Sequence, residues 1–276
     1  MSYRTILVHA DAGPGVENRV RLAARLAQDE DARLIGAAAQ LPARLVEIRA
    51  AGAAILQLAL TEDDLRGNEV DFKEAERNFY RWITGFGLES EWRTAIDFPI
   101  VAIANMAATA DLIVVGGAGE SHPPTVNPYF DTGDLIMRAG RPVLVVPSGC
   151  DELDLRHVLV AWKNTREARR ALTDALPFLK LVNHVTLLTV GESGALDASS
   201  EDAEAFLEHH GIQARSEICE PKIWTTSEQI LALAKQRAAG LIVLGAFGHA
   251  RTREWMFGGV TKDLLGHCPI PCLFSR

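Results

Sequence analysis

The residues best suited to bind a ligand lie between Leu241 and Thr261, in the sequence LIVLGAFGHARTREWMFGGVT. Several glycines follow a short apolar run, and a glycine lets the backbone turn tightly and approach a ligand because it has no Cβ atom. Gly258 and Gly259 stand where a helix is expected to begin. The free N–H groups and partial positive charge of a helix start suit a phosphate group, so the segment predicts a phosphate-binding loop.

Basic side chains lie between these glycines. His249, Arg251 and Arg253 could contact the same anion as the backbone, because charged donors form strong hydrogen bonds with phosphate oxygens. The alternative is that they are ordinary solvated loop residues. The predicted ligand-binding residues, including those contributed by other strand ends, are Gly245, Gly248, His249, Arg251, Gly258, Gly259, Val260, Thr261, Trp162, Lys163, Asp11 and Gly116.

Composition excludes several classes of protein. The chain has 276 residues, of which 48% are hydrophobic and 23% charged, as is typical of a globular protein with one large or two ordinary domains. Its net charge of -8 argues against a nucleic-acid-binding protein, which would present a basic surface. No secretory signal and no apolar run near the roughly 20 residues of a membrane span are visible. We therefore expect a cytoplasmic protein with no nucleic-acid or membrane partner.

The chain contains an internal repeat. The matching segments are RTILVHA with RHVLVA, DLIVVG with GLIVLG, and GRPVLVV with CPIPCLF. A polar, turn-rich linker, PSGCDE, separates the two copies. The repeat predicts two tandem domains, residues 1–149 and residues 154–276.

Each copy alternates short apolar runs with segments of helical period. The expected strands are residues 6–10, 33–40 and 89–95 and, in the second copy, residues 158–162, 184–190 and 213–219. A fourth strand is expected within residues 111–116 and 240–245, and the last strand of each copy follows a proline within residues 140–146 and 268–274. Continuously apolar strands are typical of parallel sheets covered on both faces, whereas residues 89–95 and 213–219 alternate and are expected nearer an edge. Helices are expected over residues 101–109 and 227–239, and an apolar helical insertion over about residues 45–60. The pattern predicts an α/β fold of two doubly wound, five-stranded parallel sheets.

In such sheets, ligands bind at the carboxyl ends of the strands, where the strand order reverses. If the first and fourth strands of each copy are neighbours, the loop after residue 10 or 161 meets the loop after residue 115 or 244. The glycine-rich segment follows residue 244, so the fold itself would place a ligand there.

The chain resembles the universal stress proteins over residues 3–148 and 154–276. Gly245, Gly248 and, after nine further residues, Gly258 carry the resemblance, inside a tandem repeat of one domain. It implies an adenine nucleotide alpha hydrolase-like fold with ATP, and magnesium with it, between the first and fourth strands. An aspartate after the first strand would serve the adenosine, and the glycines with a final Gly-Ser or Gly-Thr would hold the phosphates. The resemblance also implies pairing through the last strands, here as an internal pseudo-dimer that could assemble further into a homodimer.

The second copy departs from the family pattern at two positions. Gly259 replaces the hydroxyl residue that would contact phosphate, and Lys163 stands where the family has its aspartate. A lysine has donors only and cannot accept ribose hydrogen bonds, although it could pair with a phosphate. Trp162 could stack on a base or cap the core, and the core is favoured.

The first copy departs in the opposite way. Asp11 is present, but the loop that begins at Gly116 is GGAG followed by a longer insert. Asp134 at the following helix start would complement the helix dipole and repel a phosphate. Each copy therefore keeps one part of the site and lacks another.

No catalytic motif stands out, and we expect at most weak ATP hydrolysis. Cys268 and Cys272, beside His267, are interpreted as buried thiols, because a zinc site usually has four ligands. Two hypotheses follow. The chain is a stress-response regulatory protein that binds ATP or a related adenine nucleotide in its second domain, or it is a tandem stress protein without nucleotide that acts as an interaction module or small-ligand carrier. The second hypothesis predicts side chains that fill the crevice behind Gly245.

Overall fold

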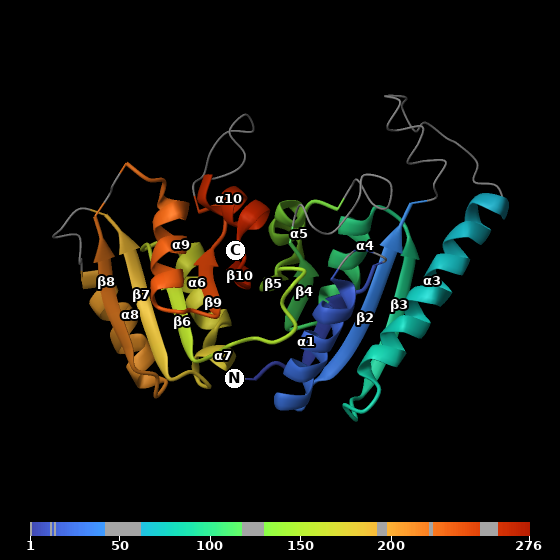
Figure 1. The fold of residues 1–276 in the computed structure, drawn as a ribbon, viewed down its shortest axis with the longest axis horizontal. Coiled ribbons are helices and arrows are strands. Elements are labelled where there is room, and N and C mark those ends of the chain that lie inside the picture. The colour runs from blue at the N-terminus through green and yellow to red at the C-terminus, as the bar shows by residue number, and fades with distance from the viewer. Residues whose placement is uncertain are drawn as a thin grey trace.

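The computed structural model describes residues 2–11, 13, 15–41, 62–117, 130–191, 198–220, 223–248 and 259–276. The strands form one ten-stranded sheet in the order β3-β2-β1-β4-β5-β10-β9-β6-β7-β8, with helices on both faces (Figure 1). Each half of the chain supplies five consecutive strands of this order, so the repeat in the sequence is a repeat in space.

The elements of the first half alternate between strand and helix. They are β1 (Thr5–His9), α1 (Val16–Asp29), β2 (Arg33–Gln40), α3 (Glu62–Ile83), β3 (Ser90–Ile96), α4 (Pro99–Met106), the short 3-10 helix η1 (Ala107–Thr109), β4 (Leu112–Gly116), α5 (Thr132–Ala139) and β5 (Val143–Val146).

The second half repeats this order. Its elements are β6 (His157–Ala161), α6 (Arg166–Asp174), α7 (Leu176–Leu179), β7 (His184–Val190), α8 (Ala198–His209), β8 (Ala214–Cys219), α9 (Thr226–Gln236), β9 (Leu241–Gly245), α10 (Gly259–His267) and β10 (Cys272–Ser275).

The predicted fold is confirmed. Within each half all paired strands are parallel, and β1 pairs with β4 as β6 pairs with β9. The last strands β5 and β10 pair antiparallel, with Leu144 opposite Leu273 and Val143 opposite Phe274. Two five-stranded units are thereby joined into an internal pseudo-dimer by one continuous ladder of backbone hydrogen bonds.

The expected boundaries differ from the observed ones for identifiable reasons. The helix expected over residues 101–109 begins at Pro99, whose fixed φ and missing N–H suit the first turn, and it tightens into η1 at its end. Helix α3 was not assigned from the sequence. The apolar insertion expected over about residues 45–60 lies outside the described residues.

The core consists of two apolar layers, one on each face of the sheet. Successive side chains of a strand point to opposite faces, so Ile6 and Val8 lie in one layer and Leu7 in the other. None of these three side chains is exposed to solvent. Strands buried on both faces explain why the sequence shows uninterrupted apolar runs instead of alternation.

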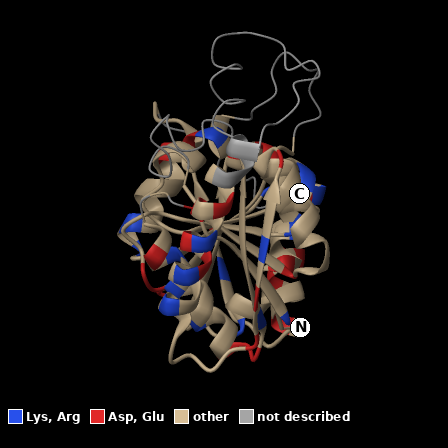
Figure 2. Ribbon diagram, turned by 90° about the vertical axis from the view of Figure 1, so that its right-hand side faces the viewer, with Lys and Arg blue, Asp and Glu red and all other residues tan. Residues whose placement is uncertain are grey.

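Charged residues lie mostly outside these layers. Figure 2 shows Lys and Arg interspersed with Asp and Glu along the outer helices and loops. Among the helices built from described residues, none is both long and apolar enough to cross a bilayer.

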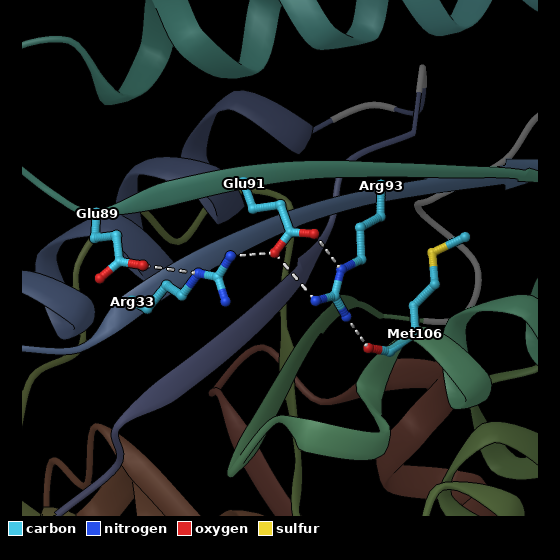
Figure 3. A network of polar contacts seen from close by, with 5 residues as sticks. All are labelled: Arg33, Glu89, Glu91, Arg93 and Met106. Carbon is cyan, nitrogen blue, oxygen red and sulfur yellow. Dashed lines mark hydrogen bonds and ion pairs between the residues drawn. The ribbon is translucent and has the colours of Figure 1, made fainter.

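The two outermost strands, β3 and β8, are the ones whose sequences alternate. A polar network covers β3 (Figure 3): Arg33 bridges Glu89 and Glu91, and Arg93 bridges Glu91 and the carbonyl oxygen of Met106. The Arg93 Nη1–Met106 O distance is 2.7 Å. The hydrogen bonds from Arg93 are the main reason that the pKa of Glu91 lies below its ordinary value. The network ties β3 to β2 and to the end of α4.

Candidate functional site

The topology brings the predicted residues to two equivalent edges of the sheet. Val8 of β1 pairs with Val114 of β4, and Ala161 of β6 pairs with Leu244 of β9. The residues that follow these strands therefore meet at the carboxyl ends, as expected for a ligand crevice in each half. His249, Arg251 and Gly258, together with Arg253, lie outside the described residues.

In the second half, the glycines of the predicted loop pack against the start of α6. A Cβ atom on Gly245 would lie 2.5 Å from the backbone nitrogen of Ala168 and 2.5 Å from the carbonyl carbon of Glu167. A Cβ atom on Gly248 would lie 3.0 Å from Glu167 Oε2 and 3.3 Å from Thr165 Oγ1. Contact with the backbone of the chain's own helix is thus enough to explain the glycine at position 245, whereas at position 248 a side chain would require only a small shift of the Glu167 and Thr165 side chains.

Glu167 is the side chain behind this loop. Its side chain is only 6% exposed, and its Oε1 lies 2.7 Å from the Nε of Arg166. Burial alone would raise the pKa of Glu167, but hydrogen bonds from Arg166, from its own backbone N–H and from Thr165 outweigh burial and lower it. An ionised carboxylate therefore occupies the first turn of α6, where the helix dipole favours negative charge.

The carboxylate of Glu167 lies beside the predicted phosphate loop. Glu167 Oε2 is close to Gly248, whose family counterpart faces phosphate according to the resemblance, and a carboxylate beside a phosphate group is unfavourable unless a cation such as Arg166 offsets its charge. The contact was missed from the sequence, where Glu167 has the pattern of an ordinary acidic residue at a helix start. No local pattern of the sequence signals this contact, because it depends on how closely β9 approaches the start of α6.

The residues after β6 divide between core and surface. Trp162 is buried in the core layer that contains Ala168 and Leu172, and its Nε1 donates to Ser199 Oγ at 3.5 Å. Its burial agrees with the core interpretation favoured from the sequence. Lys163 is exposed, and its carbonyl oxygen accepts a hydrogen bond from the backbone of Thr165 at 2.6 Å.

The start of α10 is the other described part of the predicted loop. Among the described residues, no atom lies within 4 Å of a Cβ atom built on Gly259, Val260 is half-buried, and the side chain of Thr261 is buried. Lys163 and the first N–H groups of α10 are described groups of this half that could attract an anion.

In the first half, Asp11 is held by an arginine that the sequence analysis missed. Arg19 Nη2 lies 2.7 Å from Asp11 Oδ1, with the two side chains 3% and 8% exposed. Arg19 Nε also donates to the carbonyl oxygen of His9 at 2.8 Å. A signal was present in the sequence, because Arg19 lies beside the apolar face of α1, where a buried charge requires a partner.

Aromatic stacking closes the same crevice. The ring of His9, at the end of β1, stacks on Phe130 with centroids 4.3 Å apart and planes 9° apart. Asp131 caps α5: its side chain accepts hydrogen bonds from the backbone N–H groups of Gly133 and Asp134. The two acidic residues Asp131 and Asp134 therefore both lie at the start of this helix. Gly116, the last residue of β4, is buried. The side chains of the first half thus contact one another where the resemblance places adenosine.

Metal ligands are not gathered anywhere in the part of the chain that the structure describes. No group of three or more His, Cys, Asp or Glu residues there could hold a metal ion. Cys268 and Cys272 lie together, but their neighbours are a carbonyl group and each other.

Comparison with known proteins gives a family match for the second half of the chain. Residues 154–276 match the family model described as "Universal stress protein family". Universal stress protein Slr1230 of Synechocystis sp. is 24% identical over 184 residues, which is 65% of this chain and 62% of that protein's length. The match thus spans less than two thirds of the relative.

Two solved structures extend the similarity to the whole chain. A universal stress protein from Archaeoglobus fulgidus superposes with a TM-score of 0.74 at 17% identity, covering 99% of this chain and 96% of its own. A functionally unknown protein from Pseudomonas aeruginosa has a TM-score of 0.56 at 16% identity, with coverages of 99% and 92%. At these identities the likeness is one of fold.

Proposed function

Residues 154–276 belong to the universal stress protein family and the whole chain has that family's fold, and from this premise we propose a regulatory protein that acts by binding, without chemical turnover. Its partner is a protein or a small ligand other than a nucleoside triphosphate. We place it in the cytoplasm, because the cysteines of the described residues are free thiols and cytosolic reductants keep thiols in that state.

The observation that carries the proposal is the position of Glu167. Its lowered pKa keeps it negative at neutral pH, and its Oε2 lies against Gly248 at the place that the resemblance assigns to phosphate. A triphosphate would have to displace this carboxylate from Arg166 and from the start of α6, or stay beside it at a repulsive distance.

The first half supports the same conclusion independently. The carboxylate of Asp11 is already paired with the buried guanidinium of Arg19, and the ring of Phe130 stacks on the ring of His9. Removing Asp11 from Arg19 to serve a ribose would leave a guanidinium buried without its carboxylate, which costs several kcal/mol, on the order of the binding energy of a weak ligand.

A second candidate function is binding of ATP with magnesium, or of a related adenine nucleotide, in the second half. Two observations favour it: Lys163 is exposed just after β6, and no atom of the described residues lies within 4 Å of a Cβ atom built on Gly259 at the start of α10. Both groups would attract phosphate oxygens. In that case Glu167 must turn away on binding.

Thermal unfolding with and without magnesium ATP distinguishes the two candidates. A ligand at 100 times its Kd stabilises a protein by about 2.7 kcal/mol, which corresponds to a Tm increase of roughly 5 °C or more for a chain of this size. We expect no increase at millimolar ATP and no nucleotide released on denaturing the freshly purified protein. An increase of that size, or a stoichiometric adenine nucleotide in the denatured supernatant, would replace the first candidate by the second.

Glu167→Gln provides the sharper comparison, because glutamine keeps the shape and removes the charge. We expect this variant to gain a measurable ATP-dependent Tm increase that the parent protein lacks. Arg169→Gln, on the exposed face of the same helix where Arg169 contacts Asn164, is the matched control and should gain none. Size-exclusion chromatography with light scattering would show whether the chain also assembles into a homodimer.

A further inference from the structure

Two cysteine side chains meet at the junction between α10 and β10. Cys268 follows the last residue of α10 and Cys272 is the first residue of β10, with only Pro269, Ile270 and Pro271 between them. Their sulfur atoms lie 3.4 Å apart. A disulfide bond requires about 2.05 Å between its sulfurs, so a small rotation of the side chains would bring them to bonding distance.

The surroundings hold both sulfurs in place. Cys268 Sγ donates to the carbonyl oxygen of Ile270 at 3.1 Å, and Cys272 Sγ lies 3.3 Å from the same oxygen. The turn between two prolines is stiff, because each proline ring fixes its own φ angle. The two thiols are therefore directed toward one point by a short and rigid loop.

The two thiols differ in reactivity. Cys272 is fully buried in the core, whereas Cys268 is half-buried. The hydrogen bond from Cys272, more than any other contact, lowers the pKa of Cys268 against the opposing effect of burial, and Lys235 contributes in the same direction. The same contact and burial raise the pKa of Cys272. Cys268 thus has the accessibility and thiolate character of an attacking cysteine, and Cys272 has the position of a resolving one.

We propose that Cys268 and Cys272 form a redox modification site at which a hydroperoxide converts the two thiols into an intramolecular disulfide. The thiolate of Cys268 attacks the terminal peroxide oxygen, an S–O bond forms, and the O–O bond breaks. The leaving alkoxide, or hydroxide from hydrogen peroxide, takes up the proton that Cys268 released on ionising and departs as an alcohol or as water. The sulfur of Cys272 then attacks Cys268 Sγ, the S–S bond forms, and the S–O bond breaks. The leaving hydroxide takes the proton of Cys272 and departs as water, so the peroxide gains the two electrons that the thiols lose.

The location gives the disulfide a structural effect. Cys272 pairs with Val145 of β5 across the junction of the two halves and with Ile242 of β9 on its other side. A covalent link from Cys272 to Cys268 would attach the end of α10 to the strand that joins the halves. The proposal is independent of what the crevices bind.

The other two cysteines serve as internal controls. Cys150 Sγ donates to the carbonyl oxygen of Glu152 at 3.1 Å, and burial is the main reason that the pKa of Cys150 is raised. Cys219 Sγ donates to Gln229 Oε1 at 3.2 Å. Among the described residues, neither sulfur contacts the sulfur of another cysteine, as Cys268 and Cys272 do, so neither is expected to form the intramolecular bond.

The test treats the reduced full chain with one equivalent of hydrogen peroxide and measures its intact mass. We expect a loss of about 2 Da, the two thiol hydrogens, which is reversed by a dithiol reductant, and a peptide map with residues 268 and 272 linked. The double variant Cys150→Ser/Cys219→Ser should behave in the same way. Cys272→Ser should instead gain about 16 Da and react with a sulfenic-acid probe at Cys268.

Three outcomes would overturn the proposal. They are a parent protein that gains oxygen at Cys268 without forming the disulfide, a disulfide that maps to Cys150 or Cys219, and a parent protein whose mass does not change. The peptide map of the peroxide-treated parent protein, which carries no substitution, distinguishes these outcomes even if a cysteine variant fails to fold. Circular dichroism identifies a variant that has not folded.

Discussion

The guanidinium of Arg19 and the carboxylate of Asp11 form an ion pair with 2.7 Å between Nη2 and Oδ1, inside the crevice of the first half. Both side chains are almost inaccessible to solvent, so neither charge is stabilised much by water. The pair explains how a residue that resembles a ribose ligand contributes to the fold: Asp11 neutralises a buried arginine, which in turn holds the end of β1 through His9.

Replacing Arg19 with methionine should destabilise the protein strongly. The change leaves Asp11 buried without its guanidinium, which costs about 3–5 kcal/mol of the free energy of unfolding. Urea denaturation followed by circular dichroism measures the loss. Arg21→Met is the matched control on the same helix: its pair with Glu17 is 41% and 49% exposed, and we expect a change below about 1 kcal/mol. Equal effects of the two variants would show that the burial of Arg19 contributes nothing.

Replacing Gly245 with alanine should also destabilise, through a steric clash. The new methyl group would lie 2.5 Å from the backbone of α6, which cannot move as a side-chain end could, and overpacking of this kind costs about 1–3 kcal/mol. Gly259→Ala, where the methyl group has free space, should change stability by no more than about 0.5 kcal/mol. Chemical denaturation of the two variants under one condition makes the comparison, and a neutral Gly245→Ala would mean that the loop stands farther from α6.

The pKa of Asp154 provides a test of local electrostatics. Hydrogen bonds from the side chain and backbone of Arg156 lower this pKa to about 2. A lowered pKa stabilises the folded state above the unfolded value of about 3.9 and loses that contribution as the pH falls toward 2. Carbon-detected NMR titration should find Asp154 still ionised at pH 3. In Arg156→Ala, which removes the side-chain hydrogen bonds and keeps the backbone N–H, the pKa of Asp154 should rise part of the way toward its ordinary value, and an unchanged titration would assign the shift to another group.

The junction between β5 and β10 should make the two halves unfold together. Phe274 is fully buried and lies opposite Val143 of the first half, so Phe274→Ala should cost about 3–5 kcal/mol. We expect one urea transition for the variant, with tryptophan fluorescence and circular dichroism coincident, displaced from that of the parent protein. Leu181→Ala, which truncates an exposed side chain, should leave the transition in place. Two separated transitions in the parent protein would contradict the coupling.

The spacing of apolar residues along the sequence was sufficient to predict the fold. Buried strands such as residues 33–40 are uninterrupted apolar runs, and the repeat then supplied the second domain and the pairing of the last strands. Helix α3 was not predicted because its apolar face is short. Its described buried apolar residues lie in the last turns and are Phe79, Trp82 and Ile83, whereas charged residues predominate over the rest of the helix. A helix whose apolar face covers only part of its length gives a weak periodic signal.

The place of the candidate site could be predicted from the sequence, but the contacts among its side chains could not. Strand order placed Gly245 at a crevice, because that depends on topology. The burial of Glu167 against Gly248 depends on how closely β9 approaches the start of α6, which no local pattern records. The pairing of Asp11 with Arg19 was easier to predict from the sequence, because a buried charge in α1 requires an opposite charge nearby.

The pairing of β5 with β10 has an effect on how the protein behaves in a crowded solution. Two separate half-sheets would expose four outer strands, and each exposed strand is a template on which another chain can add and start a fibre. Joining the halves leaves β3 and β8 as the end strands of the described sheet. On β3, an arriving chain would have to dehydrate Glu91 and Arg93, which already satisfy each other. The tandem arrangement thus protects the protein against polymerisation, a benefit that holds whichever ligand the crevices accept.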